Sequence, residues 1–219
     1  MAGATLSQML LTKLGHACVR LEKDGARLVI DPGVWSGPDV LAGASAILVT
    51  HEHNDHLDAG AVRAALEASP DLHLWANESV AGQLAPFGDQ VHVVGHGDTF
   101  SAAGFDVHVS GTDHAVVDRV IPVIRNTGFV VDGQVFHPGD SFTIPEEHIP
   151  VLLVPVTAPW LKFSEVADYI RTVEPERGFW IHDALVNDRA AHLLTNLLAL
   201  APARSGPASY LVPGTSVEV

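Results

Sequence analysis

Apolar residues along this chain gather in short runs that glycine, proline and acidic residues separate, a pattern typical of β-strands. The runs Ala46–Val49 and 151–156 are continuous, as in strands buried on both faces. Asp24-Gly25 lies between two runs and predicts a hairpin, because glycine adopts a positive φ without strain. The predicted strands cover residues 9–14, 18–23, 26–30, 46–49, 72–75, 91–94, 99–102, 105–110, 120–125, 128–131, 134–137, 151–156, 178–181 and 210–212.

Helices are interspersed among these strands. Residues 59–68 are rich in alanine and place Val62 and Leu66 on one side, which predicts a helix. Asp58 before it is either its N-cap or a support for the loop that precedes it. Further helices are predicted over 78–84 after an Asn77 cap, over 164–173 with Ser164 as the cap, and from Asp188 onward. This order favours an α+β fold with two packed sheets and outer helices.

The segment 50–58, which reads THEHNDHLD, follows a buried strand and holds three histidines and three acids. Imidazole and carboxylate groups bind zinc and similar divalent ions. His51 and His53 are two residues apart, so in an extended segment they point the same way. Asp55 and His56 follow a predicted turn and can point to a second position nearby. This loop can therefore supply ligands to two metal ions.

Three more candidate ligands follow predicted strands later in the chain. His114 follows the strand over 105–110, and Asp140 follows the strand over 134–137. His182 comes directly after the strand over 178–181. Because strand ends in a sandwich converge on one edge, we expect these side chains to meet the metal loop there.

The H-x-H-x-D-H pattern of residues 51–56 resembles the signature of the metallo-β-lactamase superfamily of metal-dependent hydrolases. The later segments GTDH, FHPGD and WIH, which end at His114, Asp140 and His182, follow in that family's order. The start, KLGHACV from Lys13, with Ile30-Asp31-Pro32 after it, looks like the branch of ascorbate-6-phosphate lactonases and related hydrolases. The resemblance covers nearly the whole chain, from about Leu10 to about Leu211.

The resemblance implies one domain over residues 1–219 with a four-layer αββα sandwich and a site at one edge. It implies a first metal triad of His51, His53 and His114, a second triad of Asp55, His56 and His182, and Asp140 as the bridge between them. Two metals held this way lie roughly 3.5–4 Å apart and lower the pKa of a shared water from ~15.7 toward ~7. The expected catalytic residues are Asp55, which orients the hydroxide or passes a proton, and His182. The ligand set suits one or two zinc ions, with manganese or iron as alternatives.

For several other residues near these motifs the sequence leaves two interpretations open. His16 either contacts the substrate or supports a ligand from behind, and Asp31 either holds the metal loop by hydrogen bonds or merely ends its strand. Trp160 either lines a pocket or packs in the core. His137 is expected to be structural. The loop around Trp35 is either an interface in a homo-oligomer or a cap over the substrate.

Composition narrows the functional classes. The chain has 219 residues, 47% of them hydrophobic, which is enough for a sizeable core. The net charge of −14, with only 12 scattered Lys and Arg residues, opposes binding of nucleic acid. The single cysteine, Cys18, fits a reducing compartment. The N-terminus has no charged start followed by a long apolar region, as a signal peptide would. No run reaches the roughly 20 apolar residues of a membrane-spanning helix. We therefore expect a cytoplasmic location without a membrane span.

The sequence therefore leaves three hypotheses about the function. The first is hydrolysis of an ester, lactone or phosphodiester bond in a small molecule by a metal-bound hydroxide. A sugar phosphate fits this less well, because only Arg119, Arg125 and Lys162 lie near the motifs. The second is a nuclease or phosphodiesterase acting on nucleic acid. The third is a metal-binding protein without turnover, which the complete ligand set disfavours.

Overall fold

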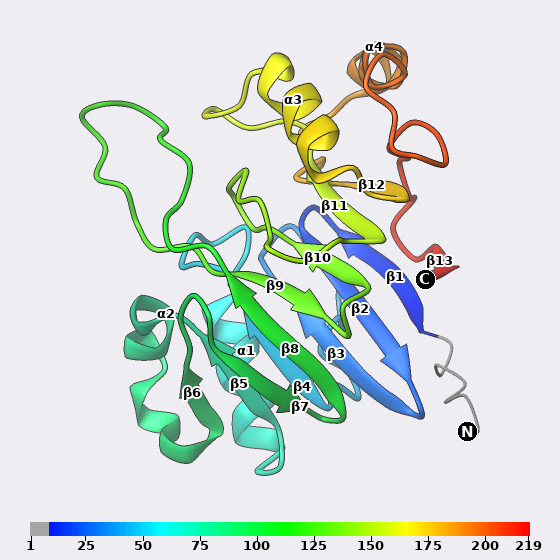
Figure 1. Cartoon of the computed structure of the whole chain (residues 1–219). Coiled ribbons are helices and arrows are strands. Elements are labelled where there is room, and N and C mark those ends of the chain that lie inside the picture. Colours follow the sequence, from blue (N-terminus) through cyan, green and yellow to red (C-terminus); the bar gives the residue numbers. More distant parts are fainter. Residues whose placement is uncertain (1–8) are drawn as a thin grey trace.

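The computed structural model describes residues 9–219; the first eight residues, on which the expected absence of a signal peptide partly rests, lie outside the described part. Within it the strands form two sheets (Figure 1). The first sheet has the order β13 (Ser216–Glu218), β1 (Leu10–Gly15), β2 (Cys18–Lys23), β3 (Ala26–Ile30), β4 (Ala46–Val49), β5 (His73–Ala76) and β6 (Val91–Val93). The second has the order β12 (Arg177–Ile181), β11 (Val151–Pro155), β10 (Val135–His137), β9 (Gly128–Val131), β8 (Phe105–Ser110) and β7 (Thr99–Ala102).

Helices cover the outer face of each sheet, which confirms the expected four-layer αββα sandwich. The helices α1 (Ala59–Ala68) and α2 (Glu78–Gln83) pack on the first sheet, and a 3-10 helix, η1 (Ala85–Gln90), follows α2. The helices α3 (Phe163–Val173) and α4 (Asp188–Leu198) pack on the second sheet. No helix within residues 9–219 is long and apolar enough to cross a lipid bilayer.

Strand alternation builds the three apolar layers between these elements. In β4, Leu48 enters the core between the sheets, whereas Ile47 enters the core beneath α1 and α2. In β11, Leu153 enters the core between the sheets and Leu152 the core beneath α3. Successive side chains of a strand point to opposite faces, so a continuous apolar run is what a strand between two cores requires.

The strand directions bring several loops to one edge. Both β8 and β10 are antiparallel to β9, and β11 and β12 continue parallel to β10, so β8, β10 and β12 end at the same side of the second sheet. The Thr127 amide, just before β9, donates to the Thr50 carbonyl at 2.9 Å and joins this edge to the end of β4 in the first sheet. The loops that carry the candidate ligands therefore share one edge of the sandwich.

Two predicted strands are wrong. Residues 120–125, which read VIPVIR, are rich in β-branched residues, but they lie in a loop whose β-pairing within the described residues is a bridge between Asp113 and Arg125. Pairing of β8 with β9 leaves no free strand edge there, and Pro122 removes an amide donor. Residues 210–212 are also not a strand; instead β13 pairs with β1.

Two of the three predicted helix N-caps are confirmed by the structure. The Asp58 carboxylate accepts a hydrogen bond from the Ala61 amide at 2.9 Å, so Asp58 is the N-cap of α1. Asn77 caps α2 as predicted. Ser164 does not cap α3, because the helix already begins at Phe163, after Lys162 at the N-cap position.

Candidate metal centre

The metal loop leaves β4 and turns at once. The amides of His56 and Leu57 both donate to the His53 carbonyl, at 3.0 and 2.8 Å, which closes a turn and sends Asp55 and His56 to one side. Gly33 packs so closely behind this turn that a Cβ atom there would lie 1.8 Å from the Asp55 carbonyl oxygen. The segment after β3 therefore acts as a backing for the loop, and only glycine fits at this point.

The candidate ligands fall into two groups in space. In each group the ligand atoms lie within 4.8 Å of one another. One group consists of His51, His53, His114 and Asp140; the other consists of His16, Asp55, His56 and His182. The structure thus brings together all seven ligands expected from the sequence and adds His16 to the second group, where the sequence left its role open.

Asp140 lies between the two groups. One of its carboxylate oxygens is 3.0 Å from His56 Nε2, and the other is 3.1 Å from His182 Nε2 and 3.3 Å from His114 Nε2. The Asp140 side chain is almost completely buried, and Trp160 Nε1 donates a hydrogen bond to it at 3.0 Å. Asp140 therefore contacts both groups, as a bridging carboxylate would.

Three of the histidines are held with one ring nitrogen facing the site. Nδ1 of His114 donates to the Ala115 carbonyl at 2.6 Å, and Nδ1 of His182 donates to the Thr157 carbonyl. Nδ1 of His56 bonds to the Asp31 carboxylate at 2.6 Å. A carbonyl oxygen only accepts, so in the neutral ring Nδ1 carries the proton and Nε2 presents its lone pair. Hydrogen bonds of this kind orient the histidine ligands of metal sites.

Asp31 also fixes the orientation of the His51 ring. The Thr50 hydroxyl donates to Asp31 at 2.7 Å, so its oxygen is left to accept from Nδ1 of His51, 3.0 Å away. The other Asp31 oxygen accepts the Thr50 amide at 2.8 Å, and the side chain is fully buried. Asp31 thus fixes His56 directly and His51 through Thr50, one histidine in each group.

The pKa values show how strongly these groups interact. Burial alone raises the pKa of the Asp140 carboxyl, but the charge of His56 and the contacts with His114 and His182 outweigh burial and hold the pKa well below its ordinary value. Burial lowers the pKa of His182, but its contacts with Asp140 and Asp55 raise it to about 9. For His51, burial holds the pKa well below its ordinary value.

The buried polar atoms at the centre test whether a metal fits. His56 Nε2, His114 Nε2, His182 Nε2 and Asp140 Oδ1 are buried; the three Nε2 atoms lie 3.0–3.3 Å from the Asp140 carboxylate, but none of the four atoms makes a hydrogen bond of normal geometry among residues 9–219. Unsatisfied buried polar atoms are rare and costly in proteins. Here they lie around the Asp140 carboxylate, between the two groups, and are the imidazole and carboxylate atoms that bind divalent metals. The residues present therefore fit a metal ion at each group.

The remaining predicted residues surround this centre. Nε2 of His16 lies 3.2 Å from the Asp55 carboxylate, and its ring packs against Trp35 with centroids 4.8 Å apart. His137 is fully buried; its Nε2 donates to the Ala17 carbonyl at 2.8 Å and its Nδ1 accepts from the Gly139 amide, which is a structural role. The Asp55 side chain is partly exposed, so solvent reaches the centre beside it.

Sequence reasoning missed several residues that hold the ligands. Asn126 accepts the Asp140 amide at 3.0 Å and donates to the Pro138 carbonyl at 2.8 Å. Lys13 is buried and bonds to the Trp180 carbonyl and to Asp183, at 2.9 and 2.7 Å, on either side of His182. The signal available for Lys13 was a lysine within a predicted strand that contains several leucines.

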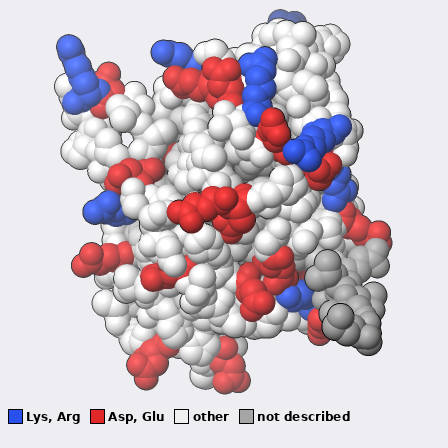
Figure 2. Space-filling model, viewed as in Figure 1, with Lys and Arg blue, Asp and Glu red and all other residues white. Residues whose placement is uncertain are grey.

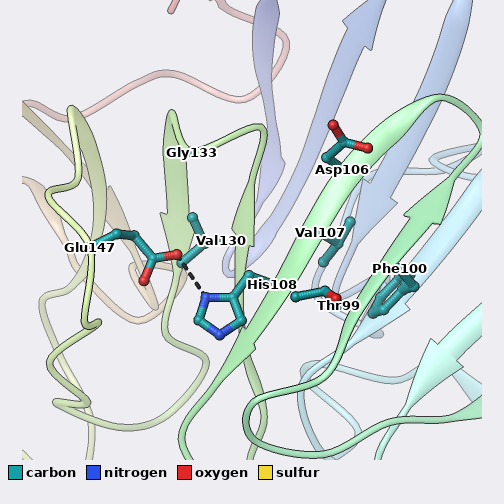
Figure 3. Close-up of a pocket in the computed structure, with 8 residues that line it drawn as sticks. All are labelled: Thr99, Phe100, Asp106, Val107, His108, Val130, Gly133 and Glu147. Atoms are coloured by element: carbon teal, nitrogen blue, oxygen red, sulfur yellow. Dashed lines mark hydrogen bonds and ion pairs between the residues drawn. The ribbon is translucent and has the colours of Figure 1, made fainter.

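A separate hollow of about 320 Å³ lies over β7, β8 and β9 (Figure 3). His108 points across it to Glu147, with Nδ1 and the carboxylate 2.8 Å apart. None of the candidate metal ligands lines this hollow. On the face shown in Figure 2, basic side chains are scattered among acidic ones and form no continuous basic patch, which is unfavourable for nucleic acid.

Comparison with known proteins points to one family. Residues 10–179 match the family model described as "Beta-lactamase superfamily domain". Protein Rv0786c of Mycobacterium tuberculosis is 41% identical over 81% of this chain and 85% of its own length. A protein of Azorhizobium caulinodans named "UPF0173 metal-dependent hydrolase" is 35% identical over 49% of this chain, and the match spans only half of that protein.

A solved structure shows the same fold. The metallo hydrolase Igni18 of Ignicoccus hospitalis superposes with a TM-score of 0.73 over 97% of this chain and 99% of its own, at 18% sequence identity. At that identity the likeness concerns the fold alone.

Proposed function

Because this chain belongs to the beta-lactamase superfamily of metal-dependent hydrolases, we propose that it hydrolyses an ester or lactone bond in a small molecule. The observation that carries the proposal is the convergence of four buried, unsatisfied ligand atoms between two groups of His and Asp residues. His51, His53, His114 and Asp140 would hold one metal ion, and Asp55, His56, His182 and Asp140 the other, with His16 close to the second. The donor set suits zinc, with manganese or iron as alternatives.

A bound divalent metal supplies Lewis acidity, which lowers the pKa of a water and polarises the substrate's carbonyl group. In hydrolysis, the water oxygen adds to the carbonyl carbon, the bond to the leaving oxygen breaks, and a proton passes from the water to that oxygen. Asp55 is suited to move this proton, because its carboxylate reaches His16 and His182 on one side and solvent on the other. Its pKa lies below the ordinary value, since contacts with those two histidines outweigh burial.

The other residues act by holding the reactive groups in place. Asp31, Trp160 and Asn126 fix the orientation of His56 and Asp140 by hydrogen bonds. His53 is exposed, and with Asp55 it marks the side from which a substrate approaches. Fixed orientation matters, because a reacting group displaced by about 1 Å loses about 10²-fold in rate.

Phosphodiester hydrolysis is the alternative within the same chemistry. A phosphate group is usually held by several Arg or Lys donors. Of the three cations near the motifs, Arg125 is paired with Asp113 at 3.0 Å, and Arg119 and Lys162 lie on separate loops. This charge pattern favours the uncharged carbonyl substrate.

The test is a metal-dependent activity assay. Protein treated with a chelator is titrated with Zn²⁺, Mn²⁺ or Fe²⁺ and assayed with p-nitrophenyl acetate, a γ-lactone and bis(p-nitrophenyl) phosphate. We expect turnover of the ester and the lactone to return with metal and to be lost in Asp55→Asn. Asp58→Asn is the matched control, because asparagine also caps a helix and Asp58 does not reach the ligands. Absence of turnover with every metal, or equal loss in both variants, contradicts the proposal.

A further inference from the structure

Exposed apolar side chains follow the candidate ligand His114 and the supporting residue Asp31 on two of the loops around the metal centre. Val34 and Trp35, which come after Asp31, are 46% and 43% exposed. Val116, two residues after His114, is 61% exposed, and Val120 farther along the same loop is 78% exposed. Single exposed apolar residues are common, but apolar patches mark binding sites. Val116 lies two residues from the candidate ligand His114, and Trp35 contacts His16, so this apolar surface adjoins the candidate metal centre.

Trp35 is held in a fixed place against the centre. The Gly37 amide donates to the Leu14 carbonyl at 3.0 Å, and the Val34 amide donates to the Asn54 carbonyl in the metal loop at 2.8 Å. A Cβ atom at Gly15 would lie 2.9 Å from the Trp35 carbonyl oxygen, so this close approach requires glycine. The ring of Trp35 rests on His16, which in turn contacts Asp55. A half-exposed aromatic ring fixed in this way is ready to receive a ligand without further ordering.

The segment 115–124, which we call the arm, projects from the end of β8 as the long green loop of Figure 1. It extends from the same edge of the sandwich as the segments that follow β10 and β11. Its base belongs to the metal centre, because the Ala115 amide donates to the Asp140 carbonyl at 2.8 Å and the His114 amide donates to the Ile124 carbonyl at 2.9 Å. The arm carries six aliphatic residues, Val116, Val117, Val120, Ile121, Val123 and Ile124.

Charge around these apolar residues is unfavourable for an anion. The chain carries a net charge of −14. Arg125 at the base of the arm is engaged with Asp113, and Arg119 on the arm follows Asp118 directly. The third cation near the motifs, Lys162, lies on a different loop, before α3. Single cations on separate loops are weak anchors for a phosphate, which binds best to several converging donors.

We propose that the site selects uncharged substrates and that Trp35 and the arm bind the apolar group attached to the bond that is cut. This inference rests on the proposed hydrolase function and names its substrate class: esters or lactones with an alkyl or aryl chain. An apolar chain that leaves water gains free energy for each methylene buried, so affinity and kcat/KM increase with chain length.

The first experiment measures kcat/KM of the metal-loaded protein for p-nitrophenyl acetate, butyrate and octanoate. We expect roughly a tenfold or larger increase from acetate to octanoate, the gain for about two methylene groups removed from water. Mono-p-nitrophenyl succinate has the acyl length of the butyrate ester and an added carboxylate, and we expect it to react at least about tenfold less well than the butyrate.

Variants assign the effect to residues. Trp35→Ala and Val120→Ser should each reduce the ratio of kcat/KM for octanoate to kcat/KM for acetate to about a third of the parent's ratio or less. This is the effect of leaving roughly one more methylene group of the substrate exposed to water. Leu200→Ser is the matched control, because Leu200 is 70% exposed just beyond α4 and is not on a ligand loop. We expect the control to keep the ratio of the parent protein.

A binding measurement separates this inference from the proposed reaction. Saturation-transfer NMR with 2-butanone and 2-octanone, which cannot be hydrolysed, should show tighter binding of the longer ketone, with the difference reduced in Trp35→Ala. If ketones discriminate by length but no ester is cleaved, the inference holds and the proposed hydrolysis fails. If esters are cleaved without dependence on length in either assay, the inference is overturned and the hydrolase remains. Dimerisation that Val120→Ser abolishes, without a change in chain-length preference, also overturns it, because the arm would then bind a second copy.

Discussion

Replacement of Asp31 by asparagine changes one atom and disturbs histidines in both metal groups. The carboxylate accepts three hydrogen bonds: the Thr50 amide at 2.8 Å, the Thr50 hydroxyl at 2.7 Å and Nδ1 of His56 at 2.6 Å. In Asp31→Asn, an NH₂ group replaces one of the two oxygens. If it faces the Thr50 amide, two donors meet; if it faces His56, it makes Nδ1 an acceptor and moves the ring proton to Nε2, which faces the site.

The backbone does not oppose this exchange. Asp31 has a φ of 53°, a conformation that asparagine adopts as readily as aspartate. The effect therefore comes from the hydrogen bonds. Loss of a hydrogen-bonded support of a metal-binding histidine raises the metal Kd by about 10–100-fold, or about 1.4–2.7 kcal/mol. A buried donor left without an acceptor lowers the free energy of unfolding by about 1–3 kcal/mol.

The assay measures the metal Kd by competition with a chromogenic chelator, and the free energy of unfolding of the metal-free protein by urea titration. Asp58→Asn serves as the control, because it makes the same chemical change beside the same loop without touching a ligand. We expect weaker metal binding at both groups in Asp31→Asn and unchanged binding in the control. A metal Kd within twofold of the parent in a folded Asp31→Asn protein refutes the assignment of the histidine orientations to Asp31.

Further predictions concern three buried or closely packed residues, Lys13, Cys18 and Gly33. Lys13→Met leaves the Asp183 carboxylate buried without its partner and should lower the free energy of unfolding by about 3–5 kcal/mol. The double variant Lys13→Met, Asp183→Leu should recover part of this loss. Urea titration measures both variants, and a loss below about 1 kcal/mol in Lys13→Met contradicts the prediction. Burial raises the pKa of the Cys18 thiol to about 12, so a thiol reagent at pH 8 should label only the unfolded chain. Because this folded pKa exceeds the unfolded value of 9.0, the contribution of Cys18 to stability is present below pH 9 and is lost as the pH rises toward 12; Cys18→Ala should therefore lose stability less steeply over that range, and parallel pH profiles would argue against it. Gly33→Ala should displace Asp55 and raise the metal Kd more at the group that contains Asp55 than at the group that contains His51. Unchanged Kd values at both groups would show that the loop accommodates the added Cβ atom.

Most strands could be predicted from the sequence, because apolar runs and turn residues are local signals, whereas the four-layer arrangement was implied by the family resemblance. The runs that become β4 and β11 face two cores each, and a continuous apolar run reports this directly. Residues 120–125 show the limit of that signal. Their β-branched residues are typical of a strand, but a strand needs a neighbour with free hydrogen-bonding groups. Here β8 already pairs with β7 and β9, and β9 also pairs with β10.

The candidate ligands could be identified from residue type and order, and Asp31 could be named as a possible support, but Asn126 and Lys13 could not. Asp140 and His182 follow strands whose ends meet only in three dimensions. Asn126, which holds the Asp140 backbone, lies in a segment that gives no chemical signal in the sequence. The position of His16 beside Asp55 depends on a positive φ of 37° in the turn between β1 and β2, which residue pattern alone does not specify.

The central claim is that two groups of His and Asp residues each bind a divalent metal. Metal content by mass spectrometry, on protein purified without added metal and then titrated with zinc, tests it most directly. We predict about two metal ions per chain, one for each group, and loss of both in the double variant His53→Ala, Asp140→Ala, with Asp58→Asn retaining the content of the parent. No metal in the purified protein, and none taken up on titration, would contradict the account.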